Sequence, residues 1–116
     1  IFGHSHCGGI RALIEKSDES APTDFIDTWM NIATPAKDAV FYNYPDCSLE
    51  EKAAHCEKAS LLVSLENLSK FPWVDSCVKN NQLALHAWYF NLSSGVIERY
   101  DANKSGFSPL IDTNTL

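Results

Sequence analysis

Hydrophobic residues recur along the chain at the three- and four-residue spacings of amphipathic helices. The expected helices cover residues 10–16, 23–31, 36–41, 49–68 and 73–79. The longest begins after Ser48, because a serine followed three residues later by Glu51 forms a capping box. Its apolar spacing predicts one buried stripe, made of Ala53, Cys56, Ala59, Leu62, Val63 and Leu65. For the helix expected over 23–31, the same spacing predicts a buried face made of Phe25, Ile26, Trp29 and, just beyond its end, Ile32.

Strands are predicted at the start of the chain and in its last third. Residues 1–3 have the pattern of the end of a buried strand. Residues 83–90 are apolar on both faces, which predicts a central strand covered on both sides. A turn over 91–95 and a second strand over 96–100 predict an antiparallel hairpin. No regular structure is predicted after Asp101.

The order strand, helices, strand, strand predicts an α/β fold. We expect part of a mostly parallel sheet covered by helices, with a late antiparallel hairpin strand. The 116 residues suffice for one domain at most, or for part of one. Because helices on both faces of a sheet need more chain than this, we expect a second chain or a further segment to complete the fold.

Composition narrows the function classes. The net charge of −6 argues against an extended nucleic-acid surface, and no apolar run reaches the length of a membrane span. The four cysteines are irregularly spaced, and with 45% apolar residues a domain does not need disulfides. We therefore expect reduced thiols and a cytoplasmic or organellar location.

The first nine residues contain the clearest chemical motif, which is His4, two further residues, Cys7 and then Gly8-Gly9. Imidazole and thiolate ligands suit Zn²⁺, and a strand that ends in this turn would direct both side chains into one pocket. A zinc site usually has at least three protein ligands. A partner upstream of Ile1 is absent from this chain, so we expect an incomplete site.

Three blocks together resemble the β-class carbonic anhydrases. Residues 3–10, with the sequence GHSHCGGI, are similar to that family's second zinc motif. The sequence CEK at 56–58, followed by VSLENL and FPWV up to residue 74, looks like its long helix and the following turn. Residues 83–90, with Ser94 and Gly95 behind them, resemble its late strand and hairpin. The three blocks follow the family's order, which predicts a single partial domain of this type over 1–116.

The resemblance implies zinc-dependent hydration of CO₂ to bicarbonate, with His4 and Cys7 as metal ligands. The family's first motif, Cys-x-Asp-x-Arg, is not present in this sequence. It would supply a further zinc ligand and the Asp-Arg dyad, so no catalytic residue is assigned in this chain. Gly8 and Gly9 would leave room for a small substrate and offer backbone N–H groups. We expect a homo-oligomer or a complementing N-terminal chain.

Other interpretations stay open at this point. The chain could be a non-catalytic structural or interaction subunit that keeps the C-terminal half of the fold, or it could hydrolyse a related small molecule such as CS₂. His6 is expected to be a surface residue or a neighbour of the metal ligands, and not a ligand itself. His86 is expected to be a core or interface histidine. The remaining thiols, of Cys47, Cys56 and Cys77, are expected to be structural or incidental.

Overall fold

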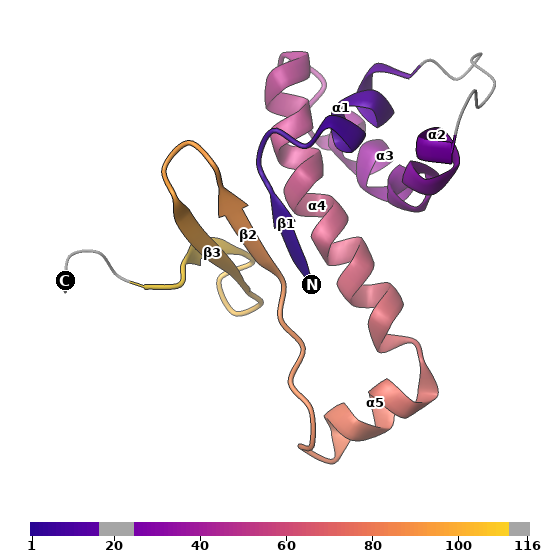
Figure 1. The fold of residues 1–116 in the computed structure, drawn as a ribbon, viewed down its shortest axis with the longest axis vertical. Coiled ribbons are helices and arrows are strands. Elements are labelled where there is room, and N and C mark those ends of the chain that lie inside the picture. The colour runs from indigo at the N-terminus through magenta and orange to yellow at the C-terminus, as the bar shows by residue number, and fades with distance from the viewer. Residues whose placement is uncertain (17–24, 112–116) are drawn as a thin grey trace.

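The computed structural model describes residues 1–16 and 25–111 as a small mixed sheet beside a group of helices (Figure 1). In chain order, the elements are β1 (Phe2–His4), α1 (Gly8–Glu15), α2 (Phe25–Met30), the 3₁₀ turn η1 (Asn31–Ala33), α3 (Thr34–Asn43), α4 (Leu49–Ser69), α5 (Pro72–Lys79), β2 (Trp88–Asn91), β3 (Val96–Asp101) and β4 (Gly106–Pro109).

The sheet has the order β1-β2-β3-β4. Strands β1 and β2 are parallel, with Phe2 opposite Trp88, whereas β2–β3 and β3–β4 are antiparallel. The parallel pair needs a long crossover, and the helices α1 to α5 supply it. The predicted α/β fold and its late antiparallel hairpin are therefore confirmed.

Helix α4 contacts α1, α3, α5 and the strands β1 and β2. Its start is the predicted one, since the Ser48 hydroxyl accepts a hydrogen bond from the Glu51 amide at 3.2 Å. Figure 1 shows α1 and α3 gathered beside its first half and the sheet along its flank. On the sheet side, Lys58 Nζ lies 3.1 Å from Glu98 Oε2 of β3 and 5.0 Å from the ring centre of Tyr89. The Lys58–Glu98 contact is an ion pair whose geometry does not meet that of a hydrogen bond.

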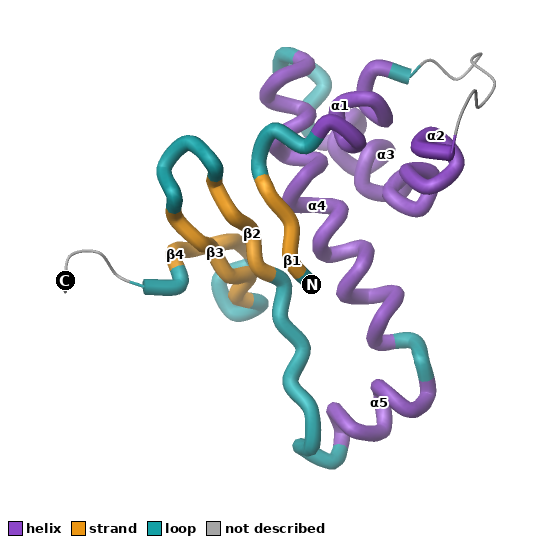
Figure 2. Tube along the Cα trace, in the orientation of Figure 1, coloured by secondary structure: helices purple, strands orange, loops and turns teal. Residues whose placement is uncertain are grey.

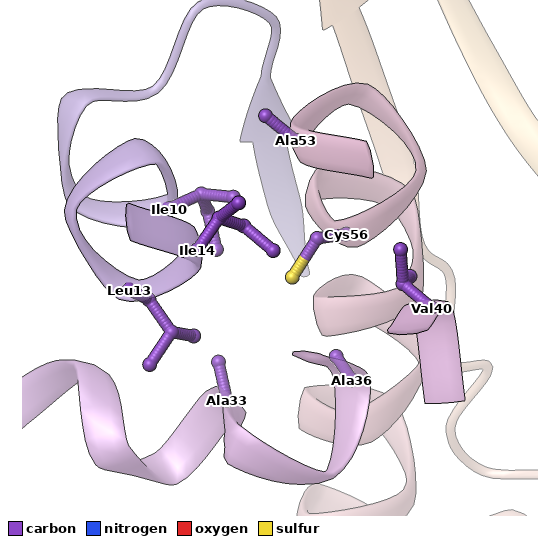
Figure 3. Packing of buried hydrophobic residues seen from close by; sticks show 8 residues of the cluster. All are labelled: Ile10, Leu13, Ile14, Ala33, Ala36, Val40, Ala53 and Cys56. Atoms are coloured by element: carbon purple, nitrogen blue, oxygen red, sulfur yellow. The ribbon is translucent and has the colours of Figure 1, made fainter. Parts of the chain in front are cut away.

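Two hydrophobic clusters hold these layers together. The larger one joins α1, η1, α3 and α4 and consists of Ile10, Leu13, Ile14, Ala33, Ala36, Val40, Ala53 and Cys56 (Figure 3). The smaller one lies between α4 and the sheet and consists of Leu61, Ala87 and Tyr89. The predicted stripe on α4 faces both clusters, because Ala59 and Val63 pack on the first and Leu62 and Leu65 on the second.

Some predicted burial is wrong. Trp29 and Ile32 are 75% and 61% exposed, although α2 contacts α1, and η1 contacts α3 and α4. The side chains of Phe25 and Ile26 lie outside the described residues. His86 is exposed on this chain, so it is not a core histidine, and its interface role stays a prediction.

The predicted strand over 83–90 is shorter than expected. Residues 80–87 form an extended loop that returns from α5, and β2 starts only at Trp88 (Figure 2). The register with β1 explains this, because it would align residues 83–85 with positions ahead of Ile1. The tail prediction is also wrong. Strand β4 forms there, with the Phe107 ring packed 5.5 Å from the ring of Tyr100.

An open sheet edge leads to the first testable prediction. Within residues 1–16 and 25–111, β1 pairs only with β2, and Phe2 beside this edge is 62% exposed. Unpaired edges and apolar surface promote association. We expect the isolated chain to self-associate at micromolar concentration in sedimentation velocity, and Phe2→Lys to reduce this association.

Leu92→Lys is the matched control, because Leu92 is also an exposed apolar residue, at 52%, but lies beyond β2 in the hairpin turn. It should leave the association unchanged. A compact, cooperatively folded monomer of the unmodified chain would contradict the prediction.

Candidate metal centre

The predicted ligand His4 ends strand β1, and its side chain is exposed. Its Nδ1 lies 2.8 Å from the carbonyl oxygen of Ser5. A carbonyl oxygen can only accept, so in the neutral ring this contact requires the tautomer with the proton on Nδ1 and the lone pair on Nε2. Metal-bound histidines have this arrangement, in which the second ring nitrogen donates to a carbonyl or carboxylate. The His4 side chain therefore fits a zinc ligand that binds through Nε2.

The second predicted ligand, Cys7, is half-buried at the N-cap of α1. Its carbonyl oxygen accepts the Arg11 amide at 3.0 Å, which starts the helix. The Cys7 amide donates a hydrogen bond to Oε2 of Glu57, a residue of α4, at 2.9 Å. The thiol thus lies at the positive end of a helix, where negative charge is favoured.

The short loop between these two residues is held on several sides. The Ser5 amide donates to the Phe90 carbonyl at 2.9 Å, and the buried Ser5 hydroxyl accepts the Leu92 amide at 2.8 Å. His6 has a φ of +54°, a left-handed conformation that is unfavourable for a residue with a side chain. Its Nε2 lies 3.2 Å from Ser93 Oγ. The loop over residues 5–7 and the turn between β2 and β3 are therefore connected through Ser5 and His6.

A buried polar pair lies beneath the loop. Glu57 of α4 is 6% exposed, and its second oxygen, Oε1, accepts the Tyr89 hydroxyl at 3.0 Å. Burial, and then the hydrogen bond to the Glu57 carboxylate, raise the pKa of Tyr89 above its usual range, while Ser5 partly offsets this rise. Glu57 was not predicted to be buried. Its position four residues after Ala53 and four before Leu61, both buried, was the available signal.

A cavity of about 520 Å³ opens beside the loop. It is lined by Ser5, His6, Cys7, Gly8, Arg11, Glu50, Ala53, Ala54, Glu57, Tyr89, Asn91 and Ser93. A Cβ added at Gly8 would meet no atom of the described part of the chain within 4 Å, so this glycine leaves free space there. Gly9 instead makes room for α2, because an added Cβ would lie 2.9 Å from Met30 Sδ. The substrate role assigned to both glycines stays a prediction.

The remaining thiols differ from Cys7 in their surroundings. Cys56 is completely buried in the larger cluster, and burial raises its thiol pKa to about 11, so it stays protonated at neutral pH. A hydrogen bond with Glu51 raises the pKa of Cys47 as well. Among the described residues, no group of three or more His, Cys, Asp or Glu side chains could hold a metal. His4 and Cys7 carry donors of the kind that zinc takes, but Cys7 lines the cavity and His4 does not, so their shared ligand role stays a prediction.

Comparison with known proteins identifies the family. A sequence profile described as "Carbonic anhydrase" matches residues 1–97. Beta carbonic anhydrase 3 of Arabidopsis thaliana is 36% identical over 103 residues, which are 87% of this chain and 40% of that protein. The chain belongs to the β-class carbonic anhydrases. Beta carbonic anhydrase 5, chloroplastic, of the same plant is 35% identical over 100 residues, 86% of this chain and 33% of that protein.

Solved structures of this class support the fold. The β-carbonic anhydrase CcaA matches 97% of this carbonic anhydrase chain and 51% of its own, with a TM-score of 0.87 at 23% identity. A C39A mutant of CafD from Aspergillus fumigatus matches 87% of this chain and 55% of its own, with a TM-score of 0.63 at 9% identity. This chain therefore spans well under two thirds of the relatives it matches. No helix in the described ranges could cross a membrane, given their lengths and polarity.

The two cysteine environments give a paired test of the ligand assignment. In the full-length zinc-loaded protein, Cys7→Ser should lower zinc affinity by more than the 10–100-fold typical of losing an outer-shell partner, because it removes a thiolate ligand. Cys56→Ser should cost stability by burying a hydroxyl in an apolar cluster, and it should leave metal content unchanged. Chelator competition and thermal unfolding measure the two effects. Full zinc in Cys7→Ser together with loss in Cys56→Ser would refute the assignment.

Proposed function

We propose that this chain is the C-terminal part of a zinc-dependent enzyme that reversibly hydrates CO₂ to bicarbonate. The observation that carries the proposal is the pair of donors at the β1–α1 loop in a chain of this family. The His4 imidazole has one nitrogen bound to the Ser5 carbonyl, and its other nitrogen has no hydrogen-bond partner within residues 1–16 and 25–111. Cys7 lies half-buried beside a cavity.

Zinc held in such a site supplies a hydroxide nucleophile at neutral pH. The chain's own residues would fix the geometry. The Ser5 carbonyl sets the tautomer and orientation of His4. The start of α1 places Cys7 where its negative charge is favoured. The remaining ligand and the groups that orient water would come from the N-terminal half of the domain, on the same polypeptide or on a partner.

The cavity suits a small substrate. Gly8 contributes open space and, in the first turn of α1, a backbone N–H without an intrahelical partner. Such an amide could donate to an oxygen of CO₂ or bicarbonate. Gly9 would contribute its amide while its missing side chain admits Met30.

Association and location follow from the same features. The open edge of β1 favours completion of the sheet by an N-terminal segment, with a homo-oligomer as the expected assembly. All four cysteines are free, which suits a reducing compartment. One of the plant relatives is named chloroplastic, which supports an organellar location beside the cytoplasmic alternative.

Stopped-flow CO₂ hydration tests the function. The isolated chain with added zinc should not exceed the buffer rate, because two protein ligands cannot hold the metal in a complete site. The full-length protein should hydrate CO₂ rapidly, and His4→Ala in it should abolish this activity. Lys70→Ala, a change at an exposed residue at the end of α4, is the control and should leave the rate unchanged.

A full-length protein that binds zinc at one ion per site but stays at the buffer rate would contradict the proposal. That result would favour the non-catalytic subunit. Hydration at the rate of a competent zinc enzyme by rigorously purified isolated chain would contradict the expected need for the N-terminal half.

A further inference from the structure

A carboxylate lies inside the molecule directly behind the metal-site loop. Glu57 is 6% exposed and belongs to the middle of α4, between the buried Cys56 and Leu61. Removing a charged carboxylate from water is costly unless its oxygens find donors. Both oxygens do so here, with the Tyr89 hydroxyl at 3.0 Å and the Cys7 amide at 2.9 Å.

One of these two donors is the backbone of a predicted zinc ligand. The amide of Cys7 is bound to Glu57, and its carbonyl oxygen is bound to the Arg11 amide at 3.0 Å. The peptide groups on both sides of the Cys7 Cα are therefore fixed. Because the Cα–Cβ direction follows from the backbone, this fixes the line along which the thiol leaves the loop.

The preceding residue shows why the backbone needs this restraint. His6 has the left-handed φ of +54°, which costs free energy for a non-glycine residue and persists only where its surroundings enforce it. The hydrogen bond from Cys7 to Glu57 acts on the next peptide group along the chain. Loss of the Glu57 acceptor would let this peptide rotate toward a more common conformation and turn the thiol away.

We propose that Glu57 is a positioning residue for zinc binding, which holds the Cys7 amide and thereby aims the Cys7 thiolate at the metal. The inference rests on the proposed ligand role of Cys7. A structural role alone would not require a carboxylate, since apolar residues of similar volume often replace buried charged groups without loss of stability. Glu57 lies next to the apolar clusters, where such a residue would fit.

The test uses the full-length zinc protein and its cobalt-substituted form. Glu57→Met keeps the volume and removes the acceptor, so zinc affinity should fall about 10–100-fold, as for other outer-shell partners of metal ligands. The thiolate-to-cobalt absorption should change as well. Glu57→Gln restores an acceptor for the Cys7 amide and should recover most of the affinity and the original cobalt spectrum.

Two controls separate positioning from general stability. Tyr89→Phe removes the other hydrogen bond of Glu57 and keeps the contact with Cys7, so the cobalt spectrum should be retained. Leu61→Ala opens a cavity one turn further along α4 and should lower the unfolding temperature without changing the zinc affinity of the folded protein.

Glu57→Leu covers the case in which Glu57→Met fails to fold. It also fills the site with an apolar side chain and offers the Cys7 amide no acceptor, so weaker zinc binding and an altered cobalt spectrum are expected. Wild-type affinity and an unchanged spectrum in folded Glu57→Met, or in folded Glu57→Leu, would overturn the proposal. Metal binding and CO₂ hydration are separate readouts. A protein whose zinc affinity depends on Glu57 but which does not hydrate CO₂ would refute only the proposed function.

Discussion

The buried carboxylate of Glu57 is the constraint on which the arrangement of the loop, the long helix and the sheet depends. One oxygen binds the Cys7 amide in the loop and the other binds Tyr89 in β2, so a single side chain of α4 joins all three parts. A buried carboxylate left without one of these donors would carry an uncompensated desolvation cost. The loop and the sheet must therefore take up their positions on α4 together.

This joining explains why residues far apart in the sequence can form one site. The loop after β1 and the turn after β2 lie side by side because the strands are parallel neighbours. Ser5 and Leu92, 87 residues apart, are then connected by a hydrogen bond of 2.8 Å. The carboxyl ends of neighbouring parallel strands are the usual place for a binding site in an α/β sheet. The position of His4 and Cys7 follows this rule.

The sequence predicted those elements whose signals are local. The capping box at Ser48 and the apolar stripe predicted the start and the buried side of α4, and the helix predicted over 73–79 is α5. Long-range partners decided the rest. The segment predicted as a strand ahead of Trp88 has no described strand beside it at the register of β1 and β2. Trp29 is exposed because no described element covers it. Strand β4 depends on Phe107 packing against Tyr100, a contact without any local periodic signal.

For the candidate metal site, the sequence predicted only the two donors, and their role as ligands stays a prediction. A histidine and a cysteine three residues apart before two glycines indicate zinc by their chemistry, and the family resemblance identified the same pair. The role of Glu57 needed the structure, because a glutamate in a helix is usually on the solvated side. The four-residue spacing of Glu57 from Ala53 and from Leu61 can be read in the sequence. It indicates that Glu57 is buried only once Ala53 and Leu61 are known to be buried.

Hydrogen bonds to the surrounding elements hold the loop of the candidate site. The Ser5 amide is bound to Phe90 of β2, the Cys7 amide to Glu57 of α4 and the Cys7 carbonyl to the Arg11 amide of α1. The Ser5 hydroxyl also accepts the Leu92 amide of the turn after β2. If His4 and Cys7 bind zinc as proposed, a segment that completes the site would meet two ligands beside a loop whose backbone is already hydrogen-bonded. Ordering a residue's backbone costs about 1–2 kcal/mol, so a three-residue loop that is fixed in advance spares several kcal/mol on metal binding. The hydrogen bonds of the loop, which contact no metal themselves, would in this way contribute to zinc affinity.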